Sequence, residues 1–237
     1  MKSDLPLQAS GAAAADYDAG LRSFMLGVYN HMMAGLGVTG IVAFMVAASP
    51  DMMAAIHGSP LKWVVMFAPL LVVFAFGAAL NRLSVQAATM LFYGFAALMG
   101  VSISSIFLVF TGTSIVQTFL VTAIAFAGLS LWGYTTKKDI SGWGSFLIMG
   151  VIGLIVASIV NIFLQSSAMQ FAISVLGVLI FAGLTAYDTQ NIKNTYLQMA
   201  GSDRDFLGKT AIMGALQLYL DFLNLFMFLL QFMGNRE

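Results

Sequence analysis

Charged residues are scarce in this chain. Asp, Glu, Lys and Arg make up 8% of its 237 residues, whereas 60% are hydrophobic, and the mean hydropathy is +0.92. Soluble domains carry roughly 25% charged residues. The composition therefore excludes an ordinary soluble protein and predicts an integral membrane protein, with no polar stretch long enough to form a separate soluble domain.

Cysteine is absent, which excludes disulfides and thiolate metal sites. His31 and His57 have no partner at ligand spacing, so we expect neither a zinc site nor a tightly bound cofactor. The net charge is zero, and no basic or acidic tail suggests a nucleic-acid partner. The N-terminus lacks the short apolar core and cleavage site of a secretory signal. We interpret residues 1–22 as a flexible, Ala-rich cytoplasmic tail.

Apolar segments long enough to cross a bilayer recur along the rest of the chain. A membrane-spanning helix needs about 20 mostly apolar residues. The sequence predicts an all-α polytopic membrane protein with seven transmembrane helices, forming one domain over residues 23–237. The helices are expected near 25–47, 62–80, 87–110, 114–134, 145–165, 168–190 and 211–233, and the long 191–210 stretch is expected to be a loop.

The distribution of Lys and Arg predicts the orientation, because cytoplasmic loops carry an excess of both. Eight basic residues fall on the side of the N-terminal tail and two, Lys62 and Arg236, on the other. We therefore expect a cytoplasmic N-terminus and, after seven spans, a C-terminus outside. The eight are Lys2, Arg22, Arg82, Lys137, Lys138, Lys193, Arg204 and Lys209.

Small and polar residues inside the spans indicate helix contacts. Ala96, Gly100 and Ser104 are four residues apart on the third predicted span, a spacing typical of close helix packing. His31 and Asn161 are expected to be hydrogen-bonded to other helices rather than to bind ligands.

Two aspartates, Asp188 and Asp221, interrupt the last two predicted spans. An ionisable side chain inside a membrane is costly and is a functional-site hypothesis by default. The predicted depths of the two differ by only about 7–8 Å at ~1.5 Å rise per residue, so the side chains are expected to meet. Each aspartate lies in a polar stripe that should face the bundle interior; the stripes are Thr185, Asp188 and Asn191, and Gln217, Asp221 and Asn224.

Two carboxylates in contact cannot both be ionised comfortably, so the pair is expected to share a proton. A cation could replace that proton. Calcium prefers oxygen ligands but takes 6–8 of them, so two aspartates would form only a weak, transient calcium site. Arg82, at the cytoplasmic end of the second span, is the candidate counter-charge. The structural alternatives are a helix-end role for Asp188, a buried hydrogen bond for Asp221 and a positive-inside anchor for Arg82.

The segments FAGLTAYDTQNIK and GALQLYLDFLNLFMFLLQFMGNR resemble the signature of the Bax inhibitor-1 family, in particular its bacterial branch. The resemblance implies a seven-helix fold with a central last helix, a bacterial inner-membrane location and a pH-sensitive calcium leak. The family's paired aspartates correspond to Asp188 and Asp221. Its arginine at the cytoplasmic end of the second span, which latches to the first aspartate in the closed state, corresponds to Arg82 in GAALNRLS.

The leading prediction is a non-enzymatic cation leak that carries calcium and is gated by protonation of the aspartate pair. Its partners would be the lipid bilayer, calcium ions and protons. The alternative, implied by some bacterial family members, is a non-transporting modulator or client of a membrane-bound ATP-dependent protease that grips the N-terminal tail. An intramembrane aspartyl protease is disfavoured, because such enzymes have GxGD at the second aspartate and this chain has LYLD.

Overall fold

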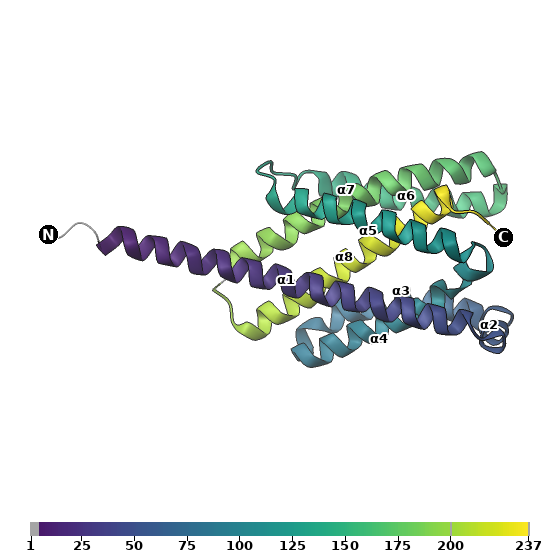
Figure 1. The fold of residues 1–237 in the computed structure, drawn as a ribbon, viewed down its shortest axis with the longest axis horizontal. Helices are drawn as coiled ribbons and strands as arrows, with labels where there is room; N and C mark the ends of the chain where they lie inside the picture. Colours follow the sequence, from purple (N-terminus) through teal and green to yellow (C-terminus); the bar gives the residue numbers. More distant parts are fainter. Residues whose placement is uncertain (1–4, 200, 237) are drawn as a thin grey trace.

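The computed structural model describes residues 5–199 and 201–236, with side chains from Asp18 onward except that of Asn81. Within these ranges the chain forms helices and no strand. Seven helices are long and apolar enough to cross a membrane (Figure 1). They are α1 (Leu5–Ala47), α3 (Leu61–Ala79), α4 (Val85–Ile103) with its continuation η2 (Ser104–Leu108), α5 (Gly112–Thr135), α6 (Trp143–Leu164), α7 (Ser167–Met199) and α8 (Arg204–Met233).

The all-α, seven-span architecture is therefore confirmed. Two short helices, α2 (Pro50–His57) and η1 (Leu80–Arg82), lie in the connections on either side of α3. The predicted tail, residues 1–22, lies partly outside the described residues. From Leu5 onward its backbone is helical and continues without a break into the first span.

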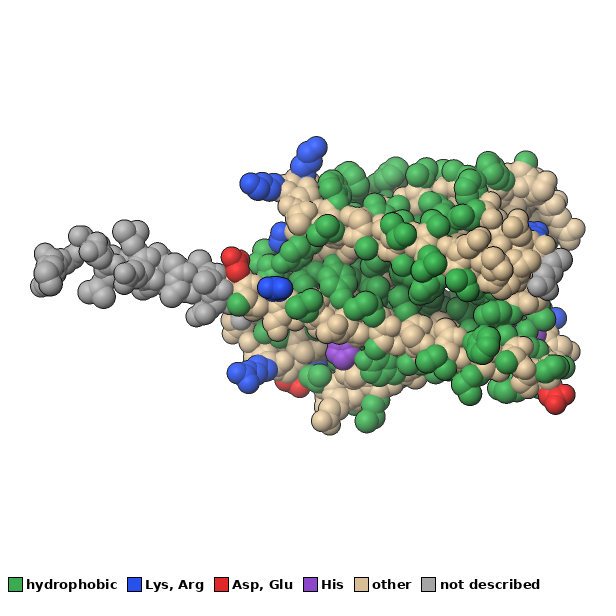
Figure 2. Space-filling view, in the orientation of Figure 1, with side chains coloured by type: hydrophobic (Ala, Val, Ile, Leu, Met, Phe, Trp, Pro, Cys, Tyr) green, Lys and Arg blue, Asp and Glu red, His purple; other side chains and the backbone are tan. Residues whose placement is uncertain are grey.

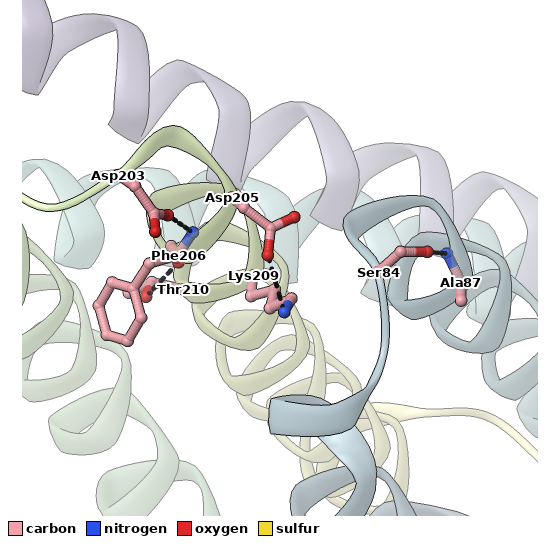
Figure 3. Close-up of polar contacts among 7 residues, drawn as sticks. All are labelled: Ser84, Ala87, Asp203, Asp205, Phe206, Lys209 and Thr210. Carbon is pink, nitrogen blue, oxygen red and sulfur yellow. Dashed lines mark hydrogen bonds and ion pairs between the residues drawn. The ribbon is translucent and has the colours of Figure 1, made fainter.

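The predicted loop over 191–210 is wrong. Helix α7 continues to Met199, and α8 already begins at Arg204. The helix continues because Ile192 and Tyr196, four residues apart, keep an apolar stripe in the core beyond the charge-free segment. Helix α8 starts early because Asp203 caps it: its Oδ1 accepts a hydrogen bond of 2.7 Å from the backbone N–H of Phe206 (Figure 3).

Helix α8 is the centre of the bundle, as the family resemblance implied. In α8, 61% of the most apolar stretch of the helix is buried. In the other six spans the corresponding share is 17–33%. Helices α1, α4, α5 and α7 pack directly on α8, whereas α3 packs mainly on α4 and α6 on α7. Figure 1 shows α8 crossing the bundle between these elements.

Small residues allow two of these helix pairs to approach closely. Gly100 of α4 faces α1 so tightly that a Cβ there would lie 2.6 Å from the carbonyl oxygen of Thr39. Ala96, one turn earlier, is fully buried. The close contact predicted from small residues on the third span is thus confirmed. Gly133 of α5 is packed in the same way against the backbone of Ala186 on α7.

Several polar side chains within the spans are bonded between helices. His31 Nδ1 on α1 lies 3.0 Å from the hydroxyl of Tyr93 on α4. Asn161 on α6 donates to Gln170 on α7 at 3.2 Å, and Gln170 in turn donates to Gln231 on α8 at 2.7 Å. The structural roles expected for His31 and Asn161 are therefore confirmed.

Candidate functional site: a buried aspartate pair

The structure brings Asp188 of α7 and Asp221 of α8 together. Their carboxyl groups lie close enough to interact directly. Asp221 is 5% exposed, and Asp188 is half-buried. The contact forms because α7 and α8 pack against each other along much of their length, with Ile192 of α7 seated on Gly214 of α8 on the N-terminal side of Asp221.

One oxygen of this pair has no protein donor. Oδ2 of Asp221 is buried and has no hydrogen-bond partner among the described residues. Ionised carboxylates accept hydrogen bonds but cannot donate them, so Asp188 satisfies Asp221 only when one of the two carries a proton. An unsatisfied buried oxygen is costly. The arrangement therefore suits a pair that holds a proton or a cation.

Among the described side chains, no basic group forms an ion pair with either aspartate. Arg82 is exposed at the end of η1 and forms no ion pair with either aspartate. Lys193 is five residues beyond Asp188, but its Nζ donates to the carbonyl oxygen of Tyr134 at 2.7 Å. Within residues 18–199 and 201–236, the one ion pair is between Asp205 and Lys209, at 2.8 Å (Figure 3).

The four supporting residues named from the sequence are not brought to the pair. Thr185 donates to the carbonyl oxygen of Phe181, and Asn224 donates to that of Leu220, so both bond within their own helices. Asn191 is exposed and Gln217 is half-buried. In the described part of the chain, none of the four is hydrogen-bonded to Asp188 or Asp221.

A hydrogen-bonded chain behind Asp188 was not predicted. The hydroxyl of Tyr29 on α1 lies 2.6 Å from Ser130 Oγ on α5, which lies 2.9 Å from Thr189 Oγ1 on α7. Thr189 donates onward to the carbonyl oxygen of Thr185 at 2.7 Å. This chain links three helices immediately beside Asp188. The signal in the sequence was the presence of single hydroxyls inside apolar spans.

The segment of α7 that follows the pair is fixed to the α5–α6 connection. Gln190 accepts from the backbone N–H of Ile140 at 2.9 Å and donates to the carbonyl oxygen of Lys138 at 2.8 Å. The oxygen and the nitrogen of the Gln190 side-chain amide are therefore both bonded to the same loop. The clamp attaches the turn of α7 that carries Asp188 to this loop.

A tight metal site is not assembled in the described residues, where no group of three or more His, Cys, Asp or Glu side chains converges. The aspartate pair offers only two carboxyl groups. Two carboxyl groups provide fewer oxygens than the 6–8 of a high-affinity calcium site.

Comparison with known proteins agrees with this architecture. Residues 21–237 match the sequence profile of the family described as "Inhibitor of apoptosis-promoting Bax1". The chain belongs to the Bax inhibitor-1 family. A protein of Caulobacter vibrioides is 53% identical over 230 residues, which cover 93% of this chain and 92% of the relative. The inner membrane protein YbhL of Escherichia coli is 45% identical over 220 residues, covering 92% and 94% respectively.

The Bax inhibitor-1 match thus extends over nearly the whole chain and nearly the whole of these relatives. Together with the seven spans, it identifies a multi-pass inner-membrane protein of this family. The residues that the resemblance assigns to the aspartate pair are the same two that the fold brings into contact at the centre of the bundle.

Proposed function

We propose that this Bax inhibitor-1 protein is a pH-sensitive cation leak that carries calcium, and that the Asp188–Asp221 pair controls the leak by exchanging a proton. The observation that carries the proposal is the direct interaction of Asp188 with the buried Asp221, whose Oδ2 has no hydrogen-bond partner among the described residues. A proton shared between the two groups lets one carboxyl group donate a hydrogen bond to the other. Its loss leaves two like charges in contact, and no described basic side chain forms an ion pair with either of them.

The two protonation states favour different packing of α7 on α8. With the proton present, Asp188 and Asp221 attract each other and hold the helices together. Without it, the carboxylates repel each other in a region of low dielectric, where charges interact more strongly than in water. Because Gln190 clamps α7 to the α5–α6 connection, the strain falls on the contact between α7 and α8.

A divalent cation stabilises the deprotonated pair. Carboxylate oxygens are the ligands that calcium prefers, but two aspartates provide fewer than the 6–8 oxygens of a tight site. Conduction needs binding that is favourable enough to admit the ion and weak enough to release it. The pair is therefore a waypoint for calcium, which is the transported ion and not a resident cofactor.

The orientation with a cytoplasmic N-terminus is part of this proposal. It is supported by the excess of Lys and Arg on one side. Arg82 belongs to the proposal as a latch in a second conformation only, because here it is exposed and forms no ion pair with Asp188. In the present conformation Arg82 is exposed at the end of a span, as expected of a positive-inside anchor.

The test is calcium flux into liposomes that contain the purified protein, measured over a series of pH values across neutrality. Wild-type flux should change with pH, and the variant carrying Asp188→Asn and Asp221→Asn should give a flat profile. Asp139→Asn is the matched control, because Asp139 lies exposed in the α5–α6 connection. An unaltered pH response in the double variant, or no flux above protein-free liposomes in the wild type, would rule out the proposal.

A further inference from the structure

A long apolar groove separates α1 from α5. Its volume is about 1110 Å³, and its floor is formed by α8. The groove exists because α1 packs on α4 and α8 whereas α5 packs on α7 and α8, so α1 and α5 make little contact with each other. Figure 2 shows the hollow between these helices, lined by hydrophobic side chains. It is at least as large as the roughly 300–1,000 Å³ of common small-molecule sites.

The side chains that line the groove suit the hydrocarbon chains of a lipid. Met33 and Ile41 of α1, Phe119 and Leu120 of α5, and Phe226 of α8 all face the groove. No acidic side chain lines it in the described part of the chain. Since the groove opens on the side of a membrane-spanning bundle, it faces lipid chains, and its walls offer an ion almost no ligands.

One end of the groove is basic. Arg22 is the one charged residue among the described side chains that line it; it is exposed and forms no ion pair. At the C-terminal end of α5, Tyr134 also lines the groove, and Lys193 Nζ lies 5.2 Å from the centre of its ring. Figure 2 shows Lys and Arg side chains gathered at the end of the bundle from which α1 projects.

We propose that this groove binds an anionic phospholipid, with its acyl chains between α1 and α5 and its phosphate at Arg22. The occupant follows from three features: an apolar wall of acyl-chain character, an opening toward the bilayer, and a basic end at the level of the headgroups, where Arg and Lys attract anionic lipids. The proposal does not depend on ion conduction and concerns a different surface from the aspartate pair.

Native mass spectrometry of the purified chain in detergent tests the charge selectivity. The probes are phosphatidylglycerol and phosphatidylcholine with identical acyl chains. Wild-type protein should retain phosphatidylglycerol several-fold better, and Arg22→Gln should remove most of that difference. Arg204→Gln is the control, because Arg204 is an exposed arginine at the start of α8 and does not line the groove. Glycerol phosphate, which lacks acyl chains, should not bind.

A second pair of variants tests the location. Gly37 and Gly40 of α1 line the groove, and a Cβ at either position meets nothing within 4 Å, so Gly37→Leu with Gly40→Leu places two side chains in the groove. Leucine is a better helix former than glycine, so the variant should fold. Gly153→Leu is the matched control: it lies on α6 with equally open surroundings, outside the groove.

The variant with Gly37→Leu and Gly40→Leu, which fills the groove, should lose most of the retained phosphatidylglycerol. Gly153→Leu should retain this lipid as the wild type does. Equal retention of the two lipids by the wild type would overturn the proposal. Unchanged retention in the filled variant would do the same, as would a lipid-free dimer in place of the lipid-bound monomer.

Discussion

Tyr219 of α8 donates a hydrogen bond to Thr39 of α1, with 2.6 Å between the two hydroxyl oxygens. The direction follows from the single proton of the threonine hydroxyl, which Thr39 gives to the carbonyl oxygen of Ala96 on α4 at 2.8 Å. One short network thus ties three helices together at a point two residues before Asp221. Both side chains are fully buried.

Tyr219→Phe should destabilise the bundle by about 0.5–1.5 kcal/mol, because it removes one buried interhelical hydrogen bond and keeps the aromatic packing. The measurement is the free energy of unfolding in detergent micelles. Tyr187→Phe is the control, since Tyr187 forms no hydrogen bond through its hydroxyl within the described residues. Equal effects of the two substitutions would contradict the role assigned to the Thr39–Tyr219 bond.

Gly100→Ala should destabilise the protein by about 1–3 kcal/mol through overpacking. The added methyl group would lie 2.6 Å from the carbonyl oxygen of Thr39 and 2.8 Å from Cβ of Val42, and backbone cannot move aside cheaply. Gly94→Ala on the same helix meets nothing within 4 Å and should be neutral or stabilising. Thermal unfolding of the two variants side by side checks the difference, and a neutral Gly100→Ala would show that α1 and α4 are less closely packed.

Asp221→Asn should stabilise the protein at alkaline pH and have little effect at acidic pH. An asparagine amide donates to Asp188 at every pH, whereas the wild-type pair needs a bound proton to do so. The gain at alkaline pH should be about 1 kcal/mol, the size of one buried hydrogen bond. Unfolding measured over a pH series checks it, and a difference between variant and wild type that does not vary with pH would contradict the shared proton.

Asp139 provides the reference for these pH series. Hydrogen bonds from the side chain and the backbone N–H of Ser141 lower the pKa of this exposed carboxyl group below its usual value. A folded-state pKa below the unfolded one adds stability that is present above the unfolded pKa and is lost as the pH falls through the folded pKa. Asp139 therefore stays charged around neutrality, and Asp139→Asn should leave the neutral and alkaline pH response unchanged.

The parts of the fold that depend on local composition could be predicted. Apolar runs of sufficient length defined the seven spans, and the small residues around Gly100 marked a close helix contact. The two aspartates could be singled out because charge inside a span is rare. Their contact was expected from matching depths, and the packing of α7 on α8 produces it.

Features that depend on how helices cross could not be predicted. The chain from Tyr29 through Ser130 to Thr189 joins three helices, and no spacing in the sequence relates them. The groove arises because α1 and α5 pack against different neighbouring helices around α8. The ion that is carried and the membrane-bound protease as a partner stay predictions, since neither follows from the packing of helices.

The helix that organises this bundle is the last of the seven spans in chain order. Until α8 enters the membrane, α1, α4, α5 and α7 lack the surface on which all four pack. The earlier helices can still form the pairs α1–α4 and α5–α7, but α8 is the helix on which both pairs pack. A chain that stops before Arg204 would keep six of its seven spans and lose the helix on which four of them pack.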